Sequence, residues 1–204
     1  MRDLWAAVRG GLRTGNPAGA LRLTLVCVCL TGALQAWQSS GPDGMRWVTR
    51  LGGVTADQPW WLALLRTPLS LFVAAPNLPV WGALVQLLVV FGVAELTVGR
   101  RWTLGIALAA TLAASWYARL GVALGPDVPV LGLPAAEGAV RDTGPSAAVA
   151  AVAVFVAYRY RAWVLCGLVS AGMLVEAVAK PNLAGKEHVV AVGVALVVAA
   201  SLRR

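Results

Sequence analysis

The sequence predicts an all-α integral membrane protein, a single domain of six transmembrane helices over residues 1–204. The chain is 59% hydrophobic and only 13% charged, with a mean hydropathy of +0.74. A soluble domain of this length needs polar outer helix faces that such a composition does not supply. Several apolar runs also approach the roughly 18 residues that mark a membrane-spanning helix. Composition and run length together place the helices in a lipid bilayer.

The first two predicted elements are a transmembrane helix over residues 19–37 and an interfacial loop over residues 38–77. The helix follows a basic N-terminus, but the sequence ALQAWQ at its end offers no clean small-residue cleavage site. We therefore interpret it as a retained helix and not as a signal peptide. The loop is apolar between residues 55 and 77 but is interrupted by prolines, and the adjacent Trp60 and Trp61 favour the headgroup level of a bilayer.

Five further apolar runs predict the remaining helices. They cover residues 78–97, 102–121, 145–159, 162–179 and 187–202. A proline-containing external loop, residues 122–143, is expected before the third of these runs. That run begins with Gly144, Pro145 and Ser146, where proline suits a first helical turn and Thr143 is expected to cap the helix. No long soluble domain remains, so any chemistry must lie among the helices or at their outer ends.

Basic residues predict the orientation of the helices. With the N-terminus inside, the short inner segments hold these arginines: Arg2, Arg9, Arg13, Arg100, Arg101, Arg159, Arg161, Arg203 and Arg204. The outer segments are longer and mix basic with acidic residues, so the positive-inside rule places both termini in the cytoplasm. Arginine greatly outnumbers lysine, and alanine, glycine and valine dominate, which points to a bacterial plasma (inner) membrane. The net charge of +8 is spread beside the apolar runs, a pattern that indicates contact with the lipid bilayer and no nucleic-acid partner.

Ser146 and His188 form the strongest candidate site. His188 is the only histidine in the chain and stands at the start of the last apolar run, and an ionisable group beside a membrane span is a functional hypothesis by default. Both residues begin their helices from the same external side, so we expect them at similar depths. Imidazole within hydrogen-bond distance turns serine into a nucleophile. Taken singly, Ser146 is an ordinary helix-start residue and His188 an interfacial side chain held by Glu187 or water.

Two short motifs surround these residues. GPSA covers residues 144–147 and EHVVAVGVA covers residues 187–195, with Ala191 and Ala195 three and seven positions after His188. Small residues at this spacing let two helices approach closely. With these motifs in this order on six spans, the chain resembles the rhomboid family of intramembrane serine proteases. The stretch FGVAELTVGRR also resembles that family's second-span pattern of glycine, glutamate, and glycine followed by a basic residue.

The resemblance implies a Ser–His dyad that cleaves transmembrane segments of membrane proteins near the outer membrane face. The residues that it assigns to the dyad and its support are Ser146, His188, Gly144, Ala147, Ala191 and Ala195. An acyl-enzyme route uses only a nucleophile, a base and oxyanion donors, so no cofactor is expected. No metal is expected either, because the chain has one histidine and its three cysteines lie singly or paired within apolar runs.

Several positions depart from the family pattern. The histidine and asparagine that help the family hold the oxyanion fall on Val80 and Leu84, and Gln86 points to another side of the helix. Pro145 has no N–H to donate, and Ala150 stands where the family has an aromatic residue. Each lost oxyanion donor costs about 10²–10³ in turnover.

Three functions therefore remain open. The first is a rhomboid-like serine protease in which Asn77, Asn182 or a loop group replaces the missing donors. The second is a catalytically impaired pseudo-rhomboid that binds transmembrane segments of its partners. The third is an unrelated channel, transporter subunit or assembly factor, which the lack of mid-span ionisable residues and internal repeats disfavours.

Overall fold

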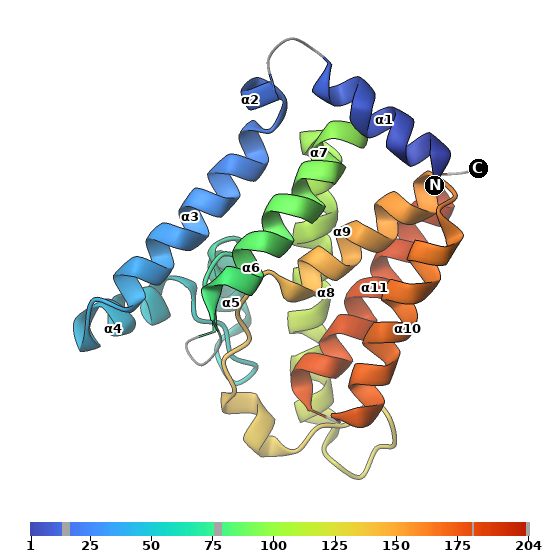
Figure 1. The fold of residues 1–204 in the computed structure, drawn as a ribbon. Helices are drawn as coiled ribbons and strands as arrows, with labels where there is room; N and C mark the ends of the chain where they lie inside the picture. Colours follow the sequence, from blue (N-terminus) through green and yellow to red (C-terminus); the bar gives the residue numbers. More distant parts are fainter. Residues whose placement is uncertain (14–16, 76–78, 181, 203–204) are drawn as a thin grey trace.

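The protein is all-helical in the computed structural model, which describes residues 1–13, 17–75, 79–180 and 182–202 (Figure 1). The α-helices are α1 (Arg2–Leu12), α2 (Pro17–Ala20), α3 (Arg22–Gln38), α4 (Pro42–Gly52), α5 (Trp60–Ser70), α6 (Val80–Gln86), α7 (Gly92–Thr97), α8 (Arg100–Leu124), α9 (Ser146–Arg159), α10 (Trp163–Ala179) and α11 (Leu183–Ser201). A π-helical segment, Leu87–Phe91, joins α6 to α7, and a short 3₁₀ helix, Ala135–Ala139, precedes α9.

Three helices in the described part of the chain are long and apolar enough to cross a membrane. They are the continuous helix Val80–Thr97, α8 and α11. α9 and α10 are also apolar but have only 14 and 17 residues. The prediction of an all-α, multi-pass membrane protein is confirmed at this level, while the number of spans stays a prediction.

Every predicted apolar run contains a helix, with shifted ends. α8 extends to Leu124 and α11 begins at Leu183, so these two helices run beyond the predicted spans, which end at 121 and begin at 187. The side chain of Asn182 accepts a hydrogen bond from the N–H of Gly185 and so starts α11 earlier. His188 consequently lies in the second turn of its helix and not at its first residue.

The segment 38–77, expected to be an interfacial loop, contains the helices α4 and α5. α4 packs against the end of α3 so closely that a Cβ on Gly44 would lie 2.0 Å from the carbonyl oxygen of Trp37. α5 packs against α4 and α8 and leaves Trp60 and Trp61 largely exposed. The prolines of this segment led us to predict a loop. Proline is, however, accepted at the start of a helix, as at Pro42.

α9 is the central helix and contacts α8, α10 and α11 (Figure 1). Its side chains are buried on nearly every side, as a helix without a polar face must be. Ala148 and Ala151 on α9 and Ala191 and Ala195 on α11 are completely buried, so the two backbones approach through small residues. This contact holds the start of α9 beside the early turns of α11.

Glu95 of α7 connects the outer helix α3 to the bundle through hydrogen bonds. Its carboxylate accepts hydrogen bonds from the backbone N–H groups of Leu23 and Thr24, at 2.9 and 2.8 Å, and from the Thr24 hydroxyl. Arg100 Nε completes the site at 2.8 Å. A carboxylate suits this position because the first N–H groups of a helix lack partners within the helix and carry partial positive charge.

Candidate active site

Ser146 is the first residue of α9 and follows a sharp turn. Gly144 has φ of +122°, a conformation that favours glycine, and its N–H donates to the Ser70 carbonyl at 3.0 Å. Pro145 is the residue before the helix, without a side-chain cap. The expected cap by Thr143 was wrong, because its hydroxyl is buried without a hydrogen-bond partner in the described part of the chain. The turn aims the start of α9 at α11.

The structure brings Ser146 and His188 together. Ser146 Oγ lies 2.9 Å from His188 Nε2. The His188 side chain is buried, with only a small exposed fraction. The contact joins α9 to α11 across 42 residues of sequence, and it is short enough for a proton to pass from the hydroxyl to the ring.

A third residue, Glu176, contacts the other side of the imidazole. Its Oε2 atom lies 3.1 Å from His188 Nδ1. α10 and α11 are antiparallel neighbours joined by a very short connection, so residues at similar distances from that connection face each other. Sequence reasoning missed Glu176 because it lay near a predicted span end. The signal was present, since a carboxylate in an apolar run needs a partner.

A cavity of about 570 Å³ opens beside these three side chains. Its walls come from the loop before α9, from the helix containing α6, and from α8, α9, α10 and α11. Ala147, Ala150 and Ala153 form the α9 side of the cavity. Because Ala150 stands where the resemblance led us to expect an aromatic ring, the space that such a ring would fill is part of the cavity.

The expected oxyanion positions Val80 and Leu84 do not line this cavity, whereas Gln86 does. These two positions were assigned by counting residues back along the helix from its C-terminal end. That count crosses the π-helical segment Leu87–Phe91, which has more residues per turn than an α-helix. Positions before that segment therefore do not keep an α-helical register with those after it. The exposed Gln86 amide is the side-chain donor that this helix supplies to the cavity.

Neither of the other two named replacement donors is found among the described residues that line the cavity. Asn182 uses its side-chain oxygen to cap α11, and Asn77 lies outside the described residues. The first turn of α9 offers backbone N–H groups at Ser146 and Ala147, because the initial N–H groups of a helix have no acceptor within it. Pro145 contributes none.

A buried carboxyl pair, Asp142 and Glu187, lies next to the dyad. Asp142 Oδ2 accepts a hydrogen bond from Ser115 at 3.0 Å, and its N–H donates to the Val54 carbonyl at 2.8 Å. Glu187 is buried and lines the same cavity, and its Oε1 atom has no hydrogen-bond partner among the described residues. Burial raises the pKa of the Asp142 carboxyl group. Two adjacent buried carboxyl groups cannot both ionise cheaply, so the pair retains a proton and adds little negative charge beside His188.

The four supporting residues named from the sequence lie where they shape this site. Gly144 forms the turn before Ser146, and Ala147 lines the cavity. Ala191 and Ala195 lie on the α11 face packed against the bundle core. These two alanines allow α11 to pack closely against its neighbours, and they take no part in a chemical step.

No group of three or more histidine, cysteine, aspartate or glutamate side chains is arranged to hold a metal ion in the described ranges. Comparison of the chain with protein-family models, with curated proteins and with solved structures finds no match. The functional inference therefore depends on the geometry of the Ser146 site.

Proposed function

We propose that the protein is a rhomboid-like intramembrane serine protease. The observation that carries the proposal is the chain of contacts from Ser146 Oγ to His188 Nε2 and from His188 Nδ1 to Glu176. Nucleophile, base and orienting carboxylate in this order make up the constellation of serine hydrolases, which is recognised by geometry and not by fold.

In the proposed reaction His188 carries its ring proton on Nδ1, where it donates to Glu176, so Nε2 is free to accept. As Ser146 Oγ attacks the scissile carbonyl carbon, its proton moves to Nε2 and the carbonyl oxygen becomes an oxyanion. The oxyanion lies against the N–H groups of the first α9 turn and the Gln86 amide. His188 then gives the proton to the leaving amine, and a water molecule hydrolyses the acyl-enzyme by the reverse sequence.

The proposed substrate is a transmembrane segment of another membrane protein. The cavity lies among apolar helices, and its side walls include Val90 from the second predicted span and Val169 and Met173 from the fifth. A segment that enters between these walls brings its backbone to Ser146. The His188 side chain is buried among the helices, which strengthens its polar contacts during the reaction.

The proposed topology has six spans in a bacterial inner membrane, with both termini in the cytoplasm and segment 38–77 at the outer interface. Figure 1 supports an even number of crossings, because the start of α1 and the end of α11 lie at the same end of the bundle. The loop between α8 and α9 lies at the other end. In this arrangement Ser146 is reached from the outer side.

A catalytically impaired, substrate-binding rhomboid-like protein is the second candidate. Pro145 removes one backbone donor, and Val80 and Leu84 lie outside the cavity wall. Such a protein would use the same cavity to hold transmembrane segments without cleaving them. The intact Ser146–His188–Glu176 contacts favour the protease over this alternative.

A fluorophosphonate probe distinguishes the two candidates, because it labels only an activated serine. The purified protein in detergent is expected to react at Ser146, and both Ser146→Ala and His188→Ala are expected to abolish labelling. Ser170→Ala is the matched control, since it removes a hydroxyl that does not line the cavity. If the wild-type protein stays unlabelled across pH and lipid composition, the protease proposal is wrong. Binding of a transmembrane peptide without cleavage would then support the second candidate.

A further inference from the structure

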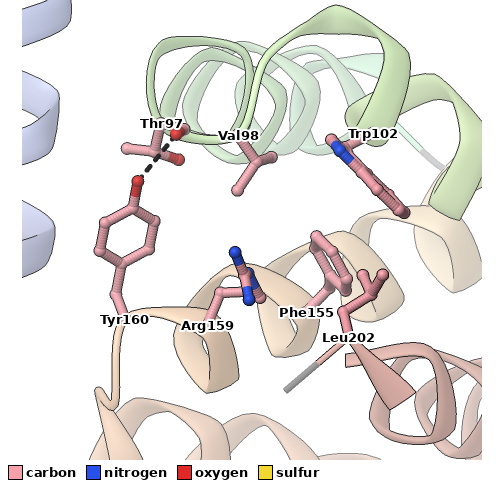
Figure 2. A pocket seen from close by; sticks show the side chains of 7 residues that line it. All are labelled: Thr97, Val98, Trp102, Phe155, Arg159, Tyr160 and Leu202. Atoms are coloured by element: carbon pink, nitrogen blue, oxygen red, sulfur yellow. Dashed lines mark hydrogen bonds between the residues drawn. The ribbon is translucent and has the colours of Figure 1, made fainter. Parts of the chain in front are cut away.

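A second cavity, of about 330 Å³, lies at the opposite end of α9 from Ser146. Figure 2 shows the side chains that line it: Thr97, Val98, Trp102, Phe155, Arg159, Tyr160 and Leu202. Trp102 of α8 stacks on Phe155 of α9, with ring centroids 5.8 Å apart. The proposed protease chemistry uses none of these residues.

Among the residues that the structure describes, the cavity combines an apolar wall with one cation, that of Arg159. Arg159 extends towards the space between Val98 and Phe155 (Figure 2). Its guanidinium group is exposed and forms no ion pair or hydrogen bond with any residue that the structure describes. Tyr160 closes one side by donating its hydroxyl proton to the Thr97 carbonyl at 2.7 Å. A guanidinium group presents five N–H donors, so Arg159 is able to bind an anionic group that enters the cavity.

The cavity also lies at the level where the membrane-crossing helices end. The span Val80–Thr97 ends here, α8 begins here at Arg100, and α11 ends here at Ser201. Trp102 is 43% exposed, and tryptophan at the end of a span is typical of the lipid headgroup level. At the headgroup level of a bilayer the available anionic group is a lipid phosphate, whose glycerol and upper acyl carbons suit apolar side chains.

We propose that this cavity binds the headgroup of an anionic phospholipid, with Arg159 as the phosphate ligand. Trp102 and Leu202 contact the glycerol and the first methylene groups, and Phe155 supports Trp102 from below. Arginine and phosphate form short, charge-assisted and often bidentate hydrogen bonds. The site is independent of Ser146, so it stands whether or not the protein cleaves its partners.

Native mass spectrometry of the full chain in a neutral detergent tests the site. The protein is titrated separately with phosphatidylglycerol, phosphatidylcholine and inorganic phosphate. We expect tighter retention of phosphatidylglycerol than of phosphatidylcholine, and an affinity for phosphatidylglycerol that falls about fivefold in Arg159→Ala. Arg101→Ala removes an equal charge from an exposed residue outside the cavity and is expected to keep the wild-type affinity.

Arg159→Lys separates binding from folding, because it keeps the charge and is expected to retain most of the affinity. Equal retention of the two lipids overturns the proposal, as does an equal loss in Arg159→Ala and Arg101→Ala. If inorganic phosphate displaces the lipid at similar concentrations, the site binds free phosphate and the lipid assignment is wrong.

Discussion

His188 contacts two side chains from two different helices, and each contact has a separate consequence. The Ser146 contact sets where a proton is accepted, and the Glu176 contact sets which ring nitrogen carries the proton. The Glu176 side chain is 39% exposed. Water therefore competes for its hydrogen bond, and its effect is weaker than that of a fully buried carboxylate.

Replacing Glu176 with glutamine is expected to slow labelling of Ser146 by roughly 10–100-fold, less than the about 10⁴-fold known for a buried triad carboxylate. The glutamine amide keeps the shape of the glutamate side chain but has no negative charge to stabilise the protonated imidazole of His188. The rate of fluorophosphonate labelling checks this, and the melting temperature is expected to stay near that of the wild type. Asp127→Asn, at an exposed loop carboxylate, is the control. Equal rates in the two variants would remove Glu176 from the mechanism.

Ionisation of Asp142 is expected to lower the stability of the protein at higher pH. Burial raises the pKa of its carboxyl group in the folded protein, so the charged form is disfavoured there relative to the unfolded chain. Stability is full below the unfolded pKa of about 3.9 and is lost as pH rises through the higher folded pKa. Asp142→Asn keeps the acceptor for Ser115 and is expected to flatten this decline. Melting temperatures from pH 4 to pH 9 measure the decline in stability. If the melting temperature of Asp142→Asn falls with pH as steeply as that of the wild type, the assignment to Asp142 is wrong.

At the scale of elements, α9 and α11 depend on small residues where they meet. Ala195 is completely buried, whereas Val197 on the same helix is 70% exposed. A larger side chain at the buried position forces the two helices apart, and that movement lengthens the Ser146–His188 contact. Packing and site geometry are thus coupled through one helix face.

Ala195→Leu is expected to destabilise the protein by about 1–3 kcal/mol, the usual cost of overpacking, and to reduce Ser146 labelling. Val197→Leu adds a similar side chain on the exposed face and is expected to change neither quantity. Thermal unfolding in detergent and probe labelling report the two effects. Wild-type labelling in Ala195→Leu would show that helix separation does not control the dyad.

Glu95 links two elements that are distant in sequence. Glu95→Ala leaves two N–H groups of α3 and the Arg100 guanidinium without their buried partner. Arg100 is about half exposed and water solvates it after the substitution, so the cost comes mainly from the unsatisfied N–H groups, at about 1–3 kcal/mol each, and we expect a clear fall in melting temperature. Glu137→Ala, outside this contact, serves as the comparison. A melting temperature close to that of Glu137→Ala would mean that α3 is held by apolar packing alone.

At the scale of the whole molecule, the start of α1 and the end of α11 lie at the opposite end of the bundle from the loop after α8 (Figure 1). With the native cysteines replaced by alanine, a cysteine at Arg2 and one at Asp127 therefore report opposite sides of a membrane. An impermeant maleimide on intact cells is expected to label Asp127→Cys and not Arg2→Cys. Labelling of both from the same side would contradict the proposed topology.

Periodicity and hydropathy predicted the positions of the main helices because apolar run length depends only on local sequence. They missed α4 and α5, whose stability comes from packing against α3 and α8. They also missed the register change at Leu87–Phe91, since a π-helical turn leaves no mark in composition. Elements held by distant contacts are the ones that a local pattern does not reveal.

The sequence by itself determined that this is a helical, apolar chain with segments able to cross a membrane, and it singled out Ser146 and His188 as the residues to pair. Their chemical types and their places at helix starts are local properties. Only the tertiary structure decided that Glu176 contacts the histidine, that Asp142 and Glu187 lie close to it, and that Gln86 lines the cavity. Those relations depend on how α6, α10 and α11 lie against α9, and that arrangement is set by the close packing of small residues between helices.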